Sequence, residues 1–184
     1  SPLAGGKVAF FPVFKPGQSH MSEPPVHADK LPSRHRGAAM NRDKIYFFDP
    51  VELEIKRIPS ECCVLDIGGG GEGVIGRVLG RRVVAIDCRE DELAEAPEGP
   101  LKIVMDATDL KFMGGTFPVA TAFFSLMYFD EESDLQTAFA EIFRVLKPHG
   151  HFRICDVDIP SVPETDKPIF AVSLKCVIDG EVLE

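Results

Sequence analysis

The fold of this chain is decided by residues 64–73, VLDIGGGGEG, where an apolar run carrying Asp66 leads into a turn made almost entirely of glycine. Glycine has no Cβ, so this turn can adopt positive φ angles and lets a ligand lie against the main chain. A second apolar run, VVAI, ends at Asp87, 21 residues after Asp66. In nucleotide folds a ribose-binding acid follows the glycine-rich loop at a spacing of about 20 residues. The pattern therefore predicts strand, glycine turn and helix, with a small molecule bound at the turn.

Length and composition predict an ordinary globular protein that handles small molecules. The chain has 184 residues, of which 45% are hydrophobic, and its mean hydropathy is +0.03. No apolar run approaches the ~20 residues of a membrane-spanning helix. The net charge of −9 disfavours nucleic acid as a partner, because phosphate contacts need clustered Lys and Arg. We expect no membrane span and no nucleic-acid partner.

The cysteines and histidines favour neither disulfides nor a metal site. There are 5 cysteines, an odd number, and no CxxC spacing. Buried thiols in a reducing cytoplasm are expected, with reactive or metal-binding thiols as the alternative. Among the 5 histidines, the only close pair is in His149-Gly150-His151, a turn after a predicted helix. We expect a cytoplasmic protein without a bound metal.

The amino-terminal part differs from the rest of the chain. We interpret residues 1–43 as a tag remnant and linker or an amino-terminal arm, and residues 44–184 as a single domain. Residues 1–20 contain a short apolar run and end in a Ser-His-Met junction typical of a cloning site, which makes Met21 the expected native start. The alternative is a genuine strand that docks on the domain or on a neighbouring chain. Residues 22–40 are polar, contain proline and have no periodicity, as in a linker.

Downstream, predicted strands alternate with predicted helices. The expected strands are 62–67, 83–87, 101–107, 117–126 and 151–158, and the expected helices are 50–58, 73–80, 91–96 and 130–147. Residues 44–49 are expected to form a short strand or a lid segment. The connection 108–116 is expected to lack a helix. The segments 170–178 and 181–184 flank Asp179-Gly180, a strong hairpin signal. This order predicts an α/β fold, a doubly wound, mostly parallel sheet with an antiparallel carboxyl-terminal hairpin at its edge.

Three acids lie at or beside the carboxyl ends of successive predicted strands, namely Asp66, Asp87 and Asp106. Ligands bind outside these ends in open parallel sheets. Each acid also has a simpler interpretation. Asp87 could cap the next helix, and Asp106 could be a turn residue before Thr108. Asp66 is harder to explain without a role, because a carboxylate beside an apolar strand needs donors.

The series of motifs resembles the class I S-adenosylmethionine (SAM)-dependent methyltransferases, in the branch that includes the ubiquinone and menaquinone biosynthesis methyltransferases. The resemblance covers residues 62–158 and implies a Rossmann-like fold. Five segments match in order, and these are VLDIGGGG, VVAIDC, KIVMDATDLKF, FPVATAFFSLMYF and AFAEIFRVLKPHGHFRI. One departure is Glu72, which stands where the family usually has glycine, with Gly73 one place later.

The resemblance implies SAM as the cofactor and assigns residues to it. The glycine turn is expected to lie against the methionine and ribose portions, with Asp66 beneath, orienting the turn and the ammonium group. Asp87 would accept both ribose hydroxyls, since a carboxylate has two acceptor oxygens. Asp106, with the backbone of Ala107, would meet the adenine amine, and Phe124, Ser125 and Leu126 would line the sulfonium end. The implied cofactor-binding residues are Asp66, Gly68, Gly69, Gly70, Asp87, Cys88, Asp106, Ala107, Phe124 and Ser125.

The implied reaction is methyl transfer from SAM to a small-molecule acceptor. The donor is already activated, so the enzyme mainly positions two reactants, and the sequence indicates no catalytic base. The segment SLMYF differs from the Asn/Asp-Pro-Pro-Tyr of enzymes that methylate amide or base nitrogens. Tyr128 and Tyr46 are candidates for the acceptor side.

Other functions fit parts of the pattern. A non-catalytic module that binds SAM or a protein partner is one, because part of the usual acceptor cap is expected to be missing or elsewhere. An NAD-dependent oxidoreductase is another, since Gly68, Gly70 and Gly73 fit its glycine frame. Asp106 and the LKPHG segment favour SAM over NAD. Pairing of the amino-terminal strand between chains would make the protein a homodimer.

Overall fold

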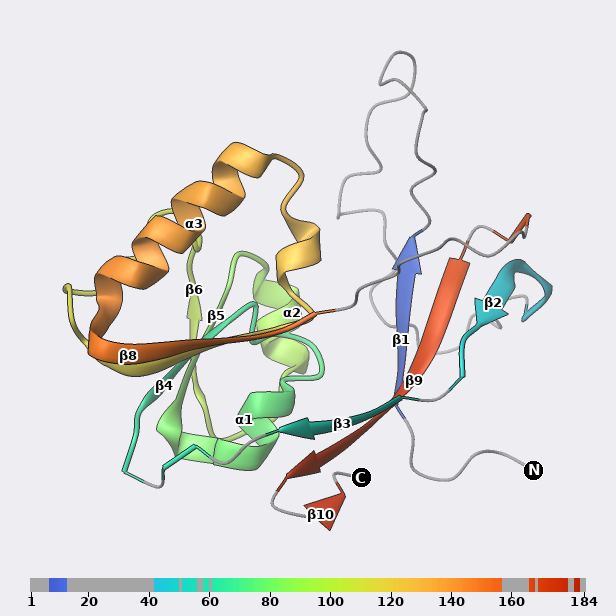
Figure 1. Cartoon of the computed structure of the whole chain (residues 1–184), viewed down its shortest axis with the longest axis horizontal. Coiled ribbons are helices and arrows are strands. Elements are labelled where there is room, and N and C mark those ends of the chain that lie inside the picture. Colours follow the sequence, from blue (N-terminus) through green and yellow to red (C-terminus); the bar gives the residue numbers. More distant parts are fainter. Residues whose placement is uncertain are drawn as a thin grey trace. The chain divides into compact units, whose positions relative to one another are not determined.

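A computed structural model describes residues 7–12, 42–49, 51–55, 58–59, 61–156, 166–167, 169–178 and 181–182 (Figure 1). The chain forms two compact units. Unit 1 combines Ser1–Ile58 with Ile159–Glu184, and unit 2 is Pro59–Asp158. Both boundaries of unit 2 fall within 44–184, the range for which the sequence predicted a single domain.

Unit 2 is built on a five-stranded parallel sheet in the order β6-β5-β4-β7-β8 (Figure 1). Every neighbouring pair of strands is parallel. The strands are β4 (Val64–Ile67), β5 (Val83–Asp87), β6 (Leu101–Val104), β7 (Phe117–Phe123) and β8 (Leu146–Cys155). The chain passes from β4 to β5 and β6 on one side, then returns to β7 and β8 on the other. The strand order therefore reverses between β4 and β7, where ligands of open α/β sheets bind.

The described part of unit 2 contains three α-helices where the sequence predicted them: α1 (Val74–Leu79), α2 (Glu90–Glu95) and α3 (Glu132–Val145). The connection between β6 and β7 has no helix, as expected. Helix α3 buries Ala138, Ile142 and Val145, which recur at the three- and four-residue spacing of one helical face. Phe143, the next residue after Ile142, is 82% exposed.

The core of unit 2 lies between the sheet and α3. Its buried members come from β4, β5, β7, α3 and the connection before β7, and they are Leu65, Ile67, Ile86, Leu110, Phe117, Ala120, Ala122, Ile142 and Val145. The central strands are apolar along their whole length because both faces of a parallel sheet are covered. Among the described residues, only Asp66 and Thr121 bring polar side chains into the buried set.

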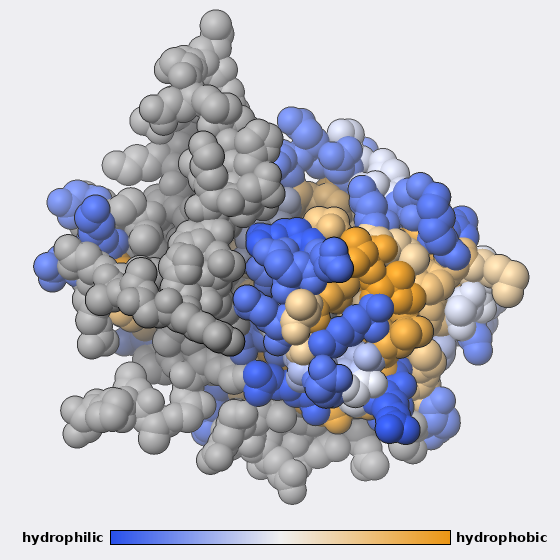
Figure 2. Space-filling model, turned by 180° about the vertical axis from the view of Figure 1, so that it is seen from behind, coloured by the Kyte–Doolittle hydropathy of each residue, from blue (hydrophilic) through white to orange (hydrophobic). Residues whose placement is uncertain are grey.

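The surface of the described chain mixes apolar and hydrophilic groups, and one view shows an apolar patch bordered by hydrophilic residues (Figure 2). The exposed large apolar residues of unit 2 are Leu101, Val104, Met113, Tyr128, Phe139, Phe143 and Ile154. Three of these belong to the edge strands β6 and β8. None of the helices in the described ranges is long and apolar enough to cross a membrane.

Unit 1 contains a second five-stranded sheet, centred on β9 (Ile169–Ile178). Strands β1 (Lys7–Pro12) and β10 (Glu181–Val182) pair antiparallel with β9. Strands β2 (Ile45–Phe47) and β3 (Val51–Ile55) pair parallel with it. The apolar run of the amino-terminal arm is therefore a strand that pairs with β9 of its own chain, as the second interpretation of residues 1–20 expected.

The helix predicted for residues 50–58 is wrong. Residues Val51–Ile55 form β3, which pairs with Leu174–Ile178 of β9. Their sequence, VELEI, alternates apolar and acidic residues. This period of two is the strand pattern, and it prevails over the four-residue spacing of Val51 and Ile55 that suggested a helix.

The predicted antiparallel edge of the parallel sheet is also wrong. The last strand of that sheet is β8, which is parallel to β7. The segments expected to form the edge are β9 and β10, and they belong to the sheet of unit 1. The reason is competition for hydrogen bonds, because β9 pairs with β1 and β10 as well as with β2 and β3.

Candidate functional site

The parallel sheet brings the predicted residues to one edge. Asp87 is level with Val104 of β6, and Ile67 is level with Ala122 of β7. The carboxyl ends of four adjacent strands are therefore aligned. The residues at or just beyond these ends, in order across the sheet, are Asp106, Asp87, Gly68 and Phe124. The sequence placed them in separate motifs, and the fold makes them neighbours along this edge.

The glycine turn fits against its surroundings without room for side chains. Gly68 has a φ of +66°, and a Cβ there would lie 2.4 Å from the Cβ of Ser125. A Cβ on Gly70 would lie 2.6 Å from the Cβ of Glu92 and 2.7 Å from Oδ2 of Asp87. The turn is thus held between the end of β7, the acid of β5 and helix α2. Glycine is required because no larger residue permits this approach.

Asp66 lies beneath the turn and inside the protein. Its side chain is 2% exposed, and Thr121 Oγ1 donates a hydrogen bond of 2.6 Å to its Oδ1. Its Oδ2 is 2.9 Å from the position that a Cβ of Gly69 would take. The pKa of Asp66 is raised to about 7. Burial is the largest cause, the hydrogen bond from Thr121 lowers the pKa, and the charge of Asp87 raises it. The acid is placed to support the turn from below.

This raised pKa predicts a pH-dependent stability. The ordinary pKa of Asp66 is 3.8 and its folded value is about 7, so between these values the folded state binds a proton that the unfolded state lacks. The free energy of unfolding should therefore fall as pH rises through this window, by at most about 1.4 kcal/mol per pH unit.

Urea unfolding of the wild type and of Asp66→Asn across this pH range provides the test. Asparagine has no carboxyl to ionise, so the difference between the two proteins should change with pH in the stated direction. A difference that stays constant would contradict the assignment.

Asp87 ends β5 and is half-buried. Its Oδ1 accepts the backbone N–H of Arg89 at 3.0 Å. Burial raises its pKa, while the N–H groups of Arg89 and Gly70 lower it. This bond shapes the turn that leads into α2, whose N-cap residue is Arg89 and whose start has no side-chain cap hydrogen bond. Asp87 is therefore not the cap of this helix. The other oxygen, Oδ2, lies toward Gly70, which places Asp87 beside the glycine turn.

Asp106 follows β6 and shapes a local turn. Its Oδ1 accepts both the backbone N–H and the hydroxyl of Thr108, each at 2.8 Å, so the turn interpretation is confirmed for this oxygen. The N–H of Met105 donates to the carbonyl of Asp87 at 2.9 Å. This bond keeps Asp106 level with the acid of the neighbouring strand. Ala107 packs against the core.

Phe124 and Ser125 close the edge on the β7 side. Phe124 has a φ of +51°, a left-handed conformation that is rare for bulky residues and concentrates at functional sites. Its N–H donates to the carbonyl of Cys155 at 2.7 Å. The Ser125 hydroxyl donates to the carbonyl of Ile67, also at 2.7 Å. The end of β7 is thereby tied to both β4 and β8.

The structure adds residues that the sequence motifs did not indicate. Thr121 holds Asp66, and Glu92 packs against Gly70 and Gly71. Thr121 could have been found from the sequence, because it places a hydroxyl inside the apolar run PVATAFF. Nothing in the sequence around Glu92 indicates its position beside the glycine turn. Glu72 has its carboxylate 3.9 Å from Arg77 of α1.

The cysteines are free thiols in the structure. Their predicted burial is wrong for Cys63 and Cys88, which are exposed, whereas Cys176 is buried. Cys88 directly follows Asp87, and its exposure reflects the point where β5 leaves the sheet. In the described ranges no group of three His, Cys, Asp or Glu residues is placed to hold a metal ion.

Comparison with protein families gives a match over this edge of the sheet. Residues 65–154 match the family described as "Methyltransferase domain". This stretch is therefore similar to methyltransferase domains. The matched range runs from β4 to β8, includes every residue described above at the edge, and covers just under half of the chain. It supports a class I SAM-dependent methyltransferase and implies SAM as the cofactor.

Several solved structures are similar to part of the chain. A protein from Pyrococcus horikoshii is 30% identical, over 53% of this chain and 47% of its own, with a TM-score of 0.47. A SAM-dependent methyltransferase from Methanosarcina mazei is 26% identical, over 53% of each chain, with a TM-score of 0.46. The YcgJ protein from Bacillus subtilis is 25% identical, over 53% of this chain and 46% of its own, with a TM-score of 0.45. The chain thus spans about half the length of these structures. No curated protein matches it.

Proposed function

We propose that the protein transfers a methyl group from SAM to a small-molecule acceptor. The observation that carries this proposal is the alignment of the glycine turn with Asp87 and Asp106 at one edge of a parallel sheet, within a stretch similar to methyltransferase domains. Each acid follows its own strand, and the strand order reverses beside the turn. The main chain of the glycine turn and the carboxylates of Asp87 and Asp106 therefore lie along one edge, where a single elongated ligand can contact them all.

The residues of this edge suit the parts of SAM. We assign the ribose hydroxyls to Asp87, whose Oδ2 lies beside the turn, and the adenine amine to Asp106. Glycine at positions 68, 69 and 70 allows the turn to pack against Ser125, Ala85 and Glu92, and we assign the main chain of this turn to the methionine and ribose portions of SAM. Bound SAM supplies a methyl group already activated on a sulfonium. The chain's own part is to bind and orient, with Asp66 supporting the turn from below.

The remaining cofactor contacts and the acceptor side are assigned from position. Phe124 and Ser125 lie at the end of β7, next to the glycine turn, and we assign them to the sulfonium end. Tyr128 follows shortly after and is 55% exposed, which suits a residue that meets the acceptor. The ubiquinone- and menaquinone-type branch is part of this proposal and rests on the five sequence motifs. The net charge of −9 favours a small acceptor over nucleic acid.

Calorimetry with S-adenosylhomocysteine (SAH), the demethylated product, and with NAD tests the proposal. We expect SAH to bind with micromolar affinity and NAD to give no heat of binding, because the glycine motif of dehydrogenases opens a full helix, whereas the helix after this turn has only 6 residues. Binding of NAD in place of SAH would favour the oxidoreductase.

An extract screen then separates an enzyme from a binding module. Incubation with SAM and fractionated small-molecule extract should produce SAH and a compound heavier by one methyl group in mass spectra. A protein that binds SAH but never forms it from SAM with any extract would be a non-catalytic module.

A further inference from the structure

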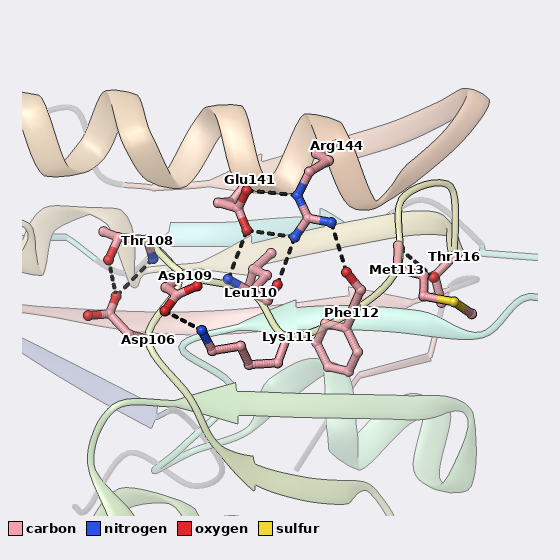
Figure 3. A network of polar contacts seen from close by, with 10 residues as sticks. All are labelled: Asp106, Thr108, Asp109, Leu110, Lys111, Phe112, Met113, Thr116, Glu141 and Arg144. Atoms are coloured by element: carbon pink, nitrogen blue, oxygen red, sulfur yellow. Dashed lines mark hydrogen bonds and ion pairs between the residues drawn. The ribbon is translucent and has the colours of Figure 1, made fainter.

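The connection between β6 and β7 is held by helix α3 through two side chains. Figure 3 shows Glu141 and Arg144 of α3 above residues 106–116. Glu141 Oε2 accepts the N–H of Leu110 at 2.9 Å. Arg144 donates to the carbonyls of Leu110 and Phe112 at 2.7 and 2.8 Å. Three backbone groups of a segment without regular structure are thus satisfied by one helix.

Glu141 and Arg144 form a rigid pair. Arg144 Nε donates to Glu141 Oε1 at 2.7 Å, and Nη2 donates to Oε2 at 2.6 Å. This two-pronged geometry depends on the planar guanidinium, whose fixed donors also reach both loop carbonyls. A lysine has a single ammonium group and cannot hold the carboxylate and the two carbonyls in one plane.

Residues 106–109 lie between two anchored points. On one side, the N–H of Met105 is bonded to the carbonyl of Asp87 in β5. On the other, Leu110 is fixed by the Glu141–Arg144 pair. Asp106 stands at the start of this short span, and Thr108 occupies its Oδ1. No donor among the described residues reaches Oδ2. The second anchor therefore controls where this oxygen lies relative to Asp87.

We propose that Glu141 and Arg144 are positioning residues that set residues 106–109 for recognition of the adenine of SAM. This inference rests on the proposed function. The side chains of Arg144 and Glu141 are 40% and 22% exposed, and exposed ion pairs contribute little to stability. The hydrogen bonds of Glu141 and Arg144 to the main chain instead go to Leu110 and Phe112. Both lie in the loop that follows Asp106, the acid assigned to adenine. Its main effect is thus on binding.

The test compares SAH affinity, by calorimetry, with thermal unfolding. Arg144→Ala is expected to weaken SAH binding by about tenfold with a small shift in melting temperature. Arg144→Lys should recover only part of the affinity, because it cannot bridge both carbonyls. Gln136→Ala is the matched control, since Gln136 is also on α3 but bonds only to Glu132 of the same helix; it should bind as the wild type does.

A double-mutant cycle with Asp106→Ala separates positioning from a general structural effect. If Arg144 acts through Asp106, its replacement should cost little further affinity once Asp106 is gone. Additive losses in the double variant would overturn the inference, as would wild-type SAH affinity in Arg144→Ala. Failure of the wild type itself to bind SAH would instead refute the proposed function.

Discussion

Replacement of Asp87 by alanine is expected to weaken SAH binding about a hundredfold. Two hydrogen bonds from ribose hydroxyls to a carboxylate would be lost, each contributing about 1.5 kcal/mol, the low end of the range for bonds to a charged group, and about 1.4 kcal/mol is tenfold in affinity. The structure holds this carboxylate in place, because Asp87 is half-buried beside Gly70 and its Oδ1 accepts a hydrogen bond from the N–H of Arg89. Calorimetric titration with SAH measures the loss directly.

Asp91→Ala is the matched control for this prediction. Asp91 is exposed and bonds to the side chain of Arg89, so its loss removes a nearby carboxylate without touching the turn. Its affinity for SAH should stay close to that of the wild type. Unchanged affinity in Asp87→Ala would show that Asp87 only shapes the start of α2, and the ribose assignment would then be wrong.

Gly68→Ala is expected to reduce the free energy of unfolding by about 3 kcal/mol and to abolish SAH binding. The backbone conformation at φ +66° is unfavourable for alanine, and its Cβ would lie 2.4 Å from the Cβ of Ser125. Either the turn or the end of β7 must move. Both carry residues assigned to the cofactor, so stability and affinity should fall together. Urea unfolding and calorimetry measure the two effects.

Gly115→Ala separates the contact from the backbone strain. Gly115 has nearly the same φ, +67°, but nothing lies within 4 Å of the position of a Cβ there. Its replacement should cost only the strain, about 1–2 kcal/mol, with little change in SAH affinity. Equal losses of unfolding free energy and of SAH affinity in the two variants would contradict this prediction. They would mean that Ser125 moves aside without an energetic penalty and that the close packing of the turn is unimportant.

Much of unit 2 could be predicted from the sequence, because its signals are local. Glycines after an apolar run require a turn, and a 14-residue helix with a clear apolar face is recognisable in isolation. The alternation of strands and helices likewise predicts a parallel sheet with its acids at one edge. The failures came from pairing between segments far apart in the sequence. VELEI satisfied both a helical and a strand spacing, and only its partner β9 settled which one forms.

The sequence by itself determined the strand–turn–helix motif and the order in which the strands of the parallel sheet follow one another along the chain. It also determined that Asp66, Asp87 and Asp106 lie at or beside the carboxyl ends of these strands. The tertiary structure alone decided that Thr121 hydrogen-bonds to Asp66 and that α3 hydrogen-bonds to the connection after β6. It also decided that β9 belongs to the sheet of unit 1 and not to the parallel sheet. These depend on residues 31 or more positions apart, as between Glu141 and Leu110. Side-chain periodicity reports which face of an element is apolar, whereas hydrogen bonds between distant segments form only after the sheets have brought them together.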